Sequence, residues 1–342
     1  MKSFTKFNAR LCKYCEEPIE KSYDAIPDIC NRPECVEKTK DACPKILECG
    51  HSCCGFKGEK KCLVCLAEPC EAKSAQALNG QTGNDYCMIC GIERLVNAPC
   101  IQSSCGHVFH LKCITTRILK RWHRPRITFN FCLCPLCKRW LEFPEESVLQ
   151  QKIIEAKKLY ENLKHKSLER LKYEKRDKDE RLTTEGDPYY QKPVEYAMAI
   201  YSYYECFKCK KPYFGGLKRC EDLMQEENKN DEFKPEELVC AECSNVGITL
   251  ENCPKHGREF IEFKCRFCCS IATWFCWGTT HFCEPCHKRQ CSGDYVSKYS
   301  KDKLPKCGGK STCPLKVDHN GNGEEFALGC ALCRNLVNSH DF

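Results

Sequence analysis

Near the carboxyl end of the chain, one cysteine lies outside any metal-ligand pair. In the segment TWFCWGTTHFCEPCH, residues 273–287, Cys283 and Cys286 have the C-x2-C spacing of zinc ligands, whereas Cys276 has no such partner. His287 follows Cys276 by eleven residues. A thiol can carry an acyl group as a thioester, and a nearby imidazole can deprotonate a hydroxyl that attacks it. Cys276 is therefore a candidate nucleophile and His287 a candidate general base.

A second cysteine, Cys220, has a different setting. Residues 214–231 begin with Phe-Gly-Gly and are rich in charged side chains, so a cysteine there gains little from burial. Lys218 and Arg219 precede it directly and would favour its thiolate form. Both thiols, with Cys269 and Cys291, remain after the metal-ligand pairs are assigned. For any single one of them, a small buried apolar residue is the more frequent role.

The number of cysteines decides the class of protein. The chain has 342 residues, of which 36 are cysteine, and it opens with MKSFTKFN rather than with the apolar stretch of a signal peptide. Disulfide-rich secreted domains are typically short, so we expect zinc and a reducing compartment, the cytosol or the nucleus. We find no run near the roughly 18 apolar residues of a membrane helix, and expect a soluble protein.

The formal net charge of +7 is weak support for a nucleic-acid partner. This value counts every cysteine as a neutral thiol. A zinc ion with four thiolates carries about two net negative charges, so several such sites would cancel the excess of lysine and arginine. A nucleic-acid partner is therefore not our leading expectation.

Eight ligands between residues 87 and 137 form four closely spaced pairs. Each pair can place two ligands on one zinc ion. Their order predicts two zinc ions bound crosswise, the first and third pairs on one ion and the second and fourth on the other. Two further cysteines, Cys100 and Cys132, lie outside the pairs. The pairs are Cys87 and Cys90, Cys105 and His107, His110 and Cys113, and Cys134 and Cys137.

This pattern resembles the RING-H2 domains of ubiquitin ligases over about fifty residues. By that resemblance, Ile89 and Pro135 belong to the surface that binds a ubiquitin-conjugating enzyme. Lys138 follows the last ligand, where many RING domains carry a cation that steadies the activated ubiquitin conjugate. The stretch from Cys113 to Cys134 is longer and more basic than in that family. The alternative is a zinc module that only scaffolds.

The first cysteine cluster also has the composition of a zinc module. Its segment CGHSCCGFKGEKKCLVC resembles the NF-X1 type of zinc finger, which has been linked to both DNA and protein contacts. We favour a structural or docking role. One site can be closed by Cys12, Cys15, Cys30 and Cys35, and ligands for nearly two more are Cys43, Cys49, Cys53, Cys62 and Cys65, with His51 and Cys70.

The third cluster offers sixteen ligands, enough for four zinc ions. This partition is not unique, because Cys269 could replace a neighbour and His287 could replace His281. In total we predict two zinc ions in residues 85–142, about four in the third cluster and two or three at the front. The sixteen ligands are Cys206, Cys209, Cys240, Cys243, Cys253, His256, Cys265, Cys268, His281, Cys283, Cys286, Cys307, Cys313, His319, Cys330 and Cys333.

These clusters predict small zinc-stabilised α+β domains joined by helical or flexible segments. The predicted order is an NF-X1-like zinc region (residues 1–75), a RING-H2 domain (85–142), a charged linker helix (144–187) and a tandem-cysteine zinc domain (190–342). The helix has one apolar stripe, which suits packing against neighbours better than a coiled coil. Residues 75–84 suggest a flexible joint. The tyrosine-rich residues 196–204 should supply core rather than stack on bases.

From Cys87 onward the chain resembles the carboxy-terminal catalytic region of the Pam/Highwire/Phr ubiquitin ligases, the RING-Cys-relay type. Those proteins are very large, so the resemblance suggests that this chain is a carboxy-terminal portion. The motifs that carry it are DYCMIC, RPRITF, YYECFKCKKPYFGG, CPKHG, KCRFCCS, FCWGTTHFC and GEEFALGC.

The resemblance implies a role for each candidate residue. Cys220 would receive ubiquitin from the conjugating enzyme and pass it to Cys276, from which a threonine, or less readily a serine, hydroxyl takes it as an ester. His287 would be the base and Glu237 the acid that orients the incoming residue. Trp277 and Phe282 would form a pocket for the threonine methyl group. Trp277 and Gln290 stand where the family is expected to have phenylalanine, and the Cys220 loop is about three residues longer, which affects the expected pocket.

Three rival functions remain open from the sequence. They are an adaptor RING ligase that transfers ubiquitin directly to lysine, a RING-between-RING ligase, which needs no Cys220, and a non-enzymatic zinc scaffold that binds nucleic acid or protein. The resemblance further implies a charged ubiquitin-conjugating enzyme and a protein substrate as partners, an F-box/Skp1-type partner bound by regions outside this chain, no membrane, and a cytoplasmic location in neuronal axons or synapses.

Overall fold

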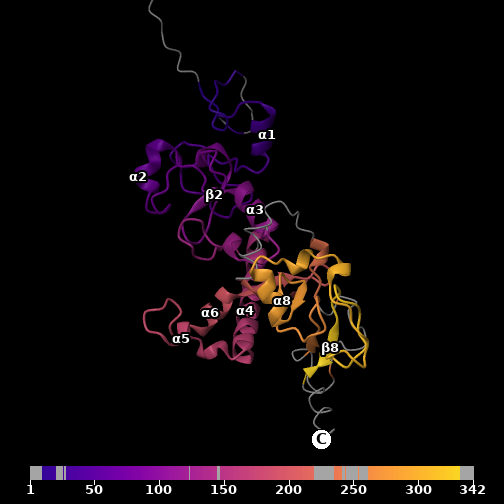
Figure 1. The fold of residues 1–342 in the computed structure, drawn as a ribbon. Helices are drawn as coiled ribbons and strands as arrows, with labels where there is room; N and C mark the ends of the chain where they lie inside the picture. The colour runs from indigo at the N-terminus through magenta and orange to yellow at the C-terminus, as the bar shows by residue number, and fades with distance from the viewer. Residues whose placement is uncertain are drawn as a thin grey trace, which may run out of the picture. The chain divides into compact units, whose positions relative to one another are not determined.

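The computed structural model describes residues 10–20, 26, 28–122, 124–144, 147–218, 235–240, 243, 253 and 261–331. Two compact units make up the chain, and each is described by itself. The first comprises Met1–His123 and Thr128–Leu159, and the second Arg124–Ile127 and Tyr160–Phe342. Both units contain short helices and two-stranded sheets (Figure 1), which confirms the predicted class of small α+β domains.

The front of the first unit has little regular secondary structure. It contains helix α1 (Pro33–Thr39), the 3-10 turn η1 (Glu68–Cys70) and helix α2 (Glu71–Ser74). Its small core combines apolar residues such as Ile26 and Ile29 with three buried cysteines. Because so few apolar side chains are present, cysteine supplies much of what is buried here.

The RING-like part of the first unit is built around one hairpin and one helix. Strands β1 (Cys100–Gln102) and β2 (Val108–His110) pair antiparallel, and helix α3 (Leu111–Lys120) follows directly. The 3-10 turns η2 (Leu95–Asn97) and η3 (Asn130–Cys132) flank them. Ile114 and Ile118 lie four residues apart on α3 and face the same core, which also contains Leu63 and Leu66 of the Cys-rich region. The two predicted zinc modules thus share a core.

Residues 75–84 are packed against this hairpin, so the prediction of a flexible joint is wrong. Leu78 is buried. The Oε1 atom of Gln81 accepts a 2.7 Å hydrogen bond from the backbone N–H of Val108, and its Nε2 donates to the carbonyl oxygen of Val108 at 3.3 Å. Asn79 donates to the carbonyl oxygen of Cys105 at 2.5 Å. The polar side chains that suggested a loop instead form hydrogen bonds with backbone groups of the hairpin and the turn before β2.

Helix α4 (Val148–Tyr173) occupies most of the segment predicted as a linker helix. In the first unit its residues Leu149, Ile153 and Ala156 join the RING-like core. In the second unit Leu163 and Leu171 are buried. The rest of the predicted helical segment forms the 3-10 turn η4 (Arg176–Lys178) and helix α5 (Glu180–Thr183), after Lys175 adopts a left-handed conformation.

The tyrosine-rich segment forms core in the second unit, as predicted. Helix α6 (Pro193–Ile200) lies beside α4 (Figure 1), and Ser167 Oγ is 3.4 Å from Met198 Sδ. Strands β3 (Tyr201–Glu205) and β4 (Pro212–Leu217) pair antiparallel. The backbone N–H of Ile127 donates to the carbonyl oxygen of Tyr203 at 2.8 Å, so part of the RPRITF motif extends this sheet. The buried tyrosines are Tyr196, Tyr201, Tyr203 and Tyr204.

The remaining elements of the second unit surround a sulfur-rich core. Strand β5 (Ile261–Phe263) pairs with β8 (Ala327–Cys330), and β6 (Trp274–Cys276) pairs with β7 (Thr280–Phe282). Helix α8 (Glu284–Cys291) follows β7, and three 3-10 turns complete the unit: η5 (Pro235–Glu237), η6 (Val296–Lys298) and η7 (Lys301–Lys303). Phe267, Phe282 and Val296 are buried in this core.

Strand β4 lies directly against the β6–β7 hairpin. The backbone N–H of Gly278 donates to the carbonyl oxygen of Gly215 at 3.0 Å, and the hydroxyl of Tyr213 donates to the carbonyl oxygen of Gly278 at 2.9 Å. Gly216 has a φ of 104°, and a Cβ atom there would overlap the carbonyl oxygen of Phe275. Glycine is therefore required for the close approach of β4 to β6.

We expect Gly216→Ala to destabilise the chain by about 1–3 kcal/mol, because a methyl group would force β4 away from Phe275 and strain the backbone. The matched control is Gly321→Ala, where a Cβ atom would meet no neighbour within 4 Å. Denaturant unfolding of the zinc-loaded chain measures both. Equal stability of Gly216→Ala and Gly321→Ala would contradict the close β4–β6 contact.

Candidate functional site

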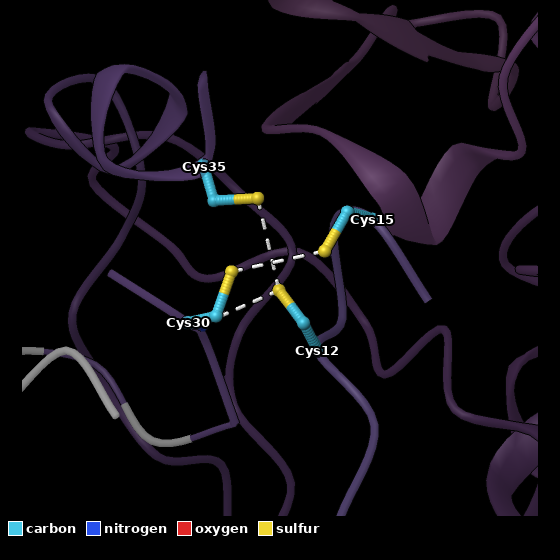
Figure 2. A group of neighbouring side chains, drawn as sticks. All are labelled: Cys12, Cys15, Cys30 and Cys35. Atoms are coloured by element: carbon cyan, nitrogen blue, oxygen red, sulfur yellow. Dashed lines mark hydrogen bonds between the residues drawn. The ribbon is translucent and has the colours of Figure 1, made fainter. Parts of the chain in front are cut away.

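Sulfur and imidazole ligand atoms gather in groups of four. In the first group, the Sγ atoms of Cys12 and Cys35 are 3.8 Å apart and those of Cys15 and Cys30 are 3.7 Å apart. Figure 2 shows the four sulfurs pointing toward one another. A tetrahedral zinc ion with Zn–S bonds of about 2.3 Å separates its sulfurs by about 3.8 Å, whereas a disulfide joins them at about 2.05 Å. The donor set and its spacing fit zinc.

The predicted crossed pairing of residues 87–137 is present. His110 Nδ1 lies 3.8 Å from the sulfurs of both Cys90 and Cys113, and its Nε2 is 2.9 Å from the carbonyl oxygen of Arg94. That second contact orients the ring, as in many histidine ligands of zinc. Two groups, each with its ligand atoms within 4.8 Å of one another, are Cys87, Cys90, His110 and Cys113, and Cys105, His107, Cys134 and Cys137.

The Cys-rich region forms a second four-ligand group in addition to that of Cys12. It consists of Cys49, His51, Cys65 and Cys70. The Sγ atom of Cys70 lies 3.5 Å from His51 Nδ1. All four residues belong to the seven candidate ligands that the sequence offers for further sites in this region, but spacing alone did not predict this grouping.

In the second unit, the ligands combine partly as expected. Cys206, Cys209, Cys240 and Cys243 form one group. Another joins Cys265, Cys268, Cys283 and Cys286, with sulfur separations of 3.5 Å for Cys268 and Cys283 and 3.8 Å for Cys268 and Cys286. Cys253 and Cys330 are described, but their predicted partners His256 and Cys333 lie outside the described residues.

Cys269 was left without a partner by spacing, but it interacts with Cys307 and Cys313. His319 Nε2 lies 3.5 Å from the sulfur of Cys307 and 3.2 Å from that of Cys313. These four side chains can hold a zinc ion. The sequence signal for Cys269 was the adjacent pair Cys268–Cys269, whose two sulfurs face different groups.

The prediction of His281 as a zinc ligand is wrong. Its Nδ1 lies 2.6 Å from Glu325 Oε2, and its ring is stacked between Phe263 and Phe275 at centroid distances of 4.0 and 4.2 Å. The four sulfurs around Cys283 complete a set without it. Successive side chains of a strand point to opposite faces, so His281 and Phe282 of β7 lie on opposite faces of the hairpin. This explains why His281 does not join the cysteine group.

Two of the spare cysteines are structural. Burial raises the pKa of Cys132 to about 12 and raises that of Cys100 well above its usual value. A buried thiol that stays protonated is a poor nucleophile. Both residues belong to the RING-like core.

Cys276 ends strand β6 and lies outside the four-sulfur group beside it. It is 0% exposed and packs in the same core as Phe282. A tight turn follows, in which Trp277 and Gly278 have φ of 56° and 72° and the N–H of Thr279 donates to the carbonyl oxygen of Cys276 at 3.2 Å. Positive φ at both central positions is typical of a type I′ hairpin turn. A bulky residue such as Trp277 rarely adopts this conformation.

Helix α8 positions His287 among aromatic rings. Its imidazole stacks on Trp274 with a centroid distance of 4.1 Å and an interplanar angle of 1°, and meets Phe282 edge-on at 5.9 Å. Trp274 Nε1 donates to Glu284 Oε2 at 2.5 Å. Sequence reasoning missed Trp274, although its position two residues before Cys276 on a strand places both on one face.

The thiol of Cys291 lies near His287. The Sγ atom of Cys291, four residues later on α8, is 3.9 Å from Nε2 and 4.0 Å from Nδ1 of His287. Cys291 is exposed. Any assignment of a catalytic thiol must therefore distinguish Cys291 from Cys276.

Two of the predicted pocket residues, Trp277 and Phe282, are in contact. Trp277 and Phe282 meet edge to face at 5.3 Å. Gln290 is buried, and its Oε1 accepts a 2.9 Å hydrogen bond from the backbone N–H of Ser297, so it holds η6 in place. Glu237 is exposed in η5, and its carboxylate has no ion-pair partner among the residues that the structure describes.

The first proposed acceptor, Cys220, lies outside the described residues. Its segment nevertheless begins at a defined place. Strand β4 ends at Leu217, which packs against the core that contains Cys276, and Gly216 lies against the backbone of Phe275 and Cys276. The chain therefore starts toward Cys220 from the immediate surroundings of Cys276.

Several apolar side chains are exposed at the metal-ligand loops of the RING-like part. Met88 is 55% exposed, Ile92 77% and Leu136 38%, whereas the predicted Ile89 and Pro135 beside them are half-buried. Arg117 Nη2 donates to the carbonyl oxygen of Asn130 at 2.5 Å and helps fix the segment before Cys134. Exposed apolar residues on a rigid scaffold are typical of a protein-binding surface.

Among the helices in the described part of the chain, none has the length and apolar character required to cross a membrane.

Comparison with curated proteins finds relatives of this chain, among them two E3 ubiquitin-protein ligases. The chain is 44% identical over 333 residues to the E3 ubiquitin-protein ligase MYCBP2 of Danio rerio, which covers 95% of this chain and 7% of that protein. It is 42% identical over 339 residues to the E3 ubiquitin-protein ligase highwire of Drosophila melanogaster, which covers 95% of this chain and 6% of that protein. The scan against protein-family models finds no match.

The chain thus spans 6–7% of the length of these curated relatives, while the similarity runs along nearly all of its own residues. The similar region includes the crossed metal-ligand groups of the first unit and the Cys276 hairpin of the second. By this similarity, the chain belongs to the Pam/Highwire/Phr family.

Proposed function

We propose that the chain acts as an E3 ubiquitin ligase of the RING-Cys-relay type, which receives ubiquitin on Cys220, passes it to Cys276 and esterifies a threonine or serine hydroxyl. The observation that carries the ligase activity is the crossed pair of four-ligand groups in residues 87–137. The names of both relatives support it, since each is called an E3 ubiquitin-protein ligase.

The exposed apolar residues at the ligand loops suit the ubiquitin-conjugating enzyme. Ile92, Met88 and Leu136 would pack against it together with Ile89 and Pro135. The metal groups supply rigidity, because each loop is closed by ligands from distant parts of the chain. Zinc here would hold the binding surface in shape and take no part in the transfer.

The relay would use two thioester exchanges followed by one ester formation. The Cys220 thiolate attacks the carbonyl carbon at the ubiquitin terminus, and the thiolate of the conjugating enzyme leaves. The Cys276 thiolate then attacks the same carbon and releases Cys220. A substrate hydroxyl attacks last, its proton passes to His287, and the Cys276 thiolate leaves.

The contact between β4 and β6 supports this order of events. It starts the Cys220 segment beside Cys276, so a loop of moderate length can bring the two thiols together. Trp274 would hold the His287 ring by stacking. Trp277 and Phe282 would receive the methyl group of threonine, and Glu237 would orient the incoming residue.

Transfer to Cys276 would also require motion. A thiol with no exposed surface cannot reach the terminus of ubiquitin, so the turn at Trp277 and Gly278 would have to open. The left-handed conformation of Trp277 suits such a change, because a bulky residue is strained in it and opening of the turn would relieve that strain.

The burial of Cys276 favours a second candidate function, an adaptor RING ligase that directs ubiquitin from the conjugating enzyme to a lysine. In that case Cys276 would be one more buried core thiol. The two candidates differ in the residue that receives ubiquitin and in their need for Cys220.

We expect Cys276→Ala and Cys220→Ala each to abolish ubiquitin transfer to free threonine from a charged conjugating enzyme, while discharge to lysine stays low. Intact mass of the products measures this. Cys291→Ala is the matched control, because it removes the exposed thiol beside His287. Loss of transfer in Cys291→Ala with full activity in Cys276→Ala would assign the thioester to Cys291, and lysine transfer in all variants would support the adaptor function.

We expect Ile92→Asp to lower the rate of discharge of the conjugating enzyme about tenfold or more, since a central apolar contact commonly contributes over 1 kcal/mol to binding. The zinc content and folding should not change, because Ile92 is 77% exposed. The control is Ile46→Asp, which is also exposed and lies in the same unit. Unchanged discharge by Ile92→Asp would place the binding surface elsewhere.

A further inference from the structure

Four thiols of the Cys-rich region remain after its two four-ligand groups are formed: Cys43, Cys53 and Cys54 in the core of the first unit, and Cys62 packed against that core. Cys54 interacts electrostatically with Tyr14 and Cys100, which leaves Cys43, Cys53 and Cys62. The thiol of Cys43 hydrogen-bonds with Cys53 and interacts electrostatically with Cys62 and with the carboxylate of Glu59. Three sulfur ligands alone leave a tetrahedral zinc ion one ligand short.

A carboxylate lies close to these thiols. Glu59 Oε1 lies 3.2 Å from the sulfur of Cys53. A tetrahedral zinc ion with Zn–S of about 2.3 Å and Zn–O of about 2.0 Å separates its sulfur and oxygen ligands by about 3.5 Å. The observed distance is within a few tenths of an ångström of that value.

The local backbone brings Glu59 to this place. The N–H of Glu59 donates to the carbonyl oxygen of Phe56 at 3.3 Å, and Gly58 has a φ of 87°, as in a turn with glycine at its third residue. The N–H of Gly55 donates to the sulfur of Cys53 at 3.3 Å. A Cβ atom on Gly55 would overlap the carboxylate of Glu59, so glycine at this position leaves room for it.

Electrostatics favours a bound cation over an empty cluster. Three thiolates and a carboxylate this close together would repel one another. A zinc ion neutralises the repulsion and gives each group a partner.

We propose that Glu59 completes a third zinc site in the Cys-rich region, with Cys43, Cys53 and Cys62 as the other ligands. The site is independent of ubiquitin transfer. Because a carboxylate is a harder ligand than a thiolate and binds zinc with less preference, this site releases its ion more readily than the four-thiolate group of Cys12.

The test is the zinc count of the intact chain by native mass spectrometry during titration with a zinc chelator. We expect Glu59→Ala to hold one zinc ion fewer than the wild-type chain, as Cys62→Ala does. Gly55→Ala keeps all four ligands but displaces the carboxylate, and should also lose its zinc ion at lower chelator concentration. The matched control, Glu48→Ala, changes an exposed acid in the same region and should keep the wild-type count.

A further variant keeps the proposal testable if Glu59→Ala fails to fold. Glu59→Cys supplies a fourth thiolate, and we expect it to bind the wild-type number of zinc ions and to release one of them more slowly than the wild-type chain. A wild-type zinc count in Glu59→Ala would overturn the proposal and leave Glu59 as a hydrogen-bond acceptor for the Cys53 thiol. Equal release from Glu59→Cys and the wild-type chain would overturn it as well.

Discussion

The convergence of sulfur and imidazole ligands on single points is the interaction on which the rest of the structure depends. In the part of the chain that the structure describes, the strands have three to six residues and the sheets have two strands each. Such elements bury too little apolar surface to fold alone. In each group, ligands from distant segments meet at separations that suit a tetrahedral ion, so metal binding can supply the free energy that apolar burial lacks.

This constraint explains what the sequence could predict. Pairs such as Cys134 and Cys137 are set by local spacing, and their order along the chain was enough to predict the crossed groups of the RING-like part. The inclusion of Cys269 and the exclusion of His281 depended on which face of a strand or turn each side chain occupies, and spacing does not contain that information. The same limit applies to Glu59, whose carboxylate reaches the thiol of Cys53 only through a turn that glycine permits.

Tertiary contacts also overrode composition outside the metal groups. Residues 75–84 have the polar, glycine-containing composition of a loop, yet Gln81 and Asn79 hydrogen-bond to the backbone near β2. The tyrosines of residues 196–204 were predicted correctly as core, because a small domain with few aliphatic residues needs large side chains to fill it. The stacking of Trp274 on His287 could be found only from the structure, since it joins a strand to a helix.

The metal groups divide the cysteines into ligands and thiols outside the groups, and the proposed relay depends on that division. A thiolate bound to zinc is held in place and its charge is shared, whereas Cys276 stands beside the Cys283 group without belonging to it. It lies at the end of β6, next to strand β4, whose last residue Leu217 precedes Cys220 by three positions in the sequence. In the proposed relay, the burial of Cys276 makes exchange depend on movement of the hairpin.

The most direct measurement is the mass of the chain after brief reaction with a charged conjugating enzyme, quenched without reductant and followed by peptide mapping. We expect one ubiquitin on Cys276 through a bond that reductant cleaves. If no adduct sensitive to reductant forms on the chain while lysine still receives ubiquitin, the relay through Cys276 is contradicted.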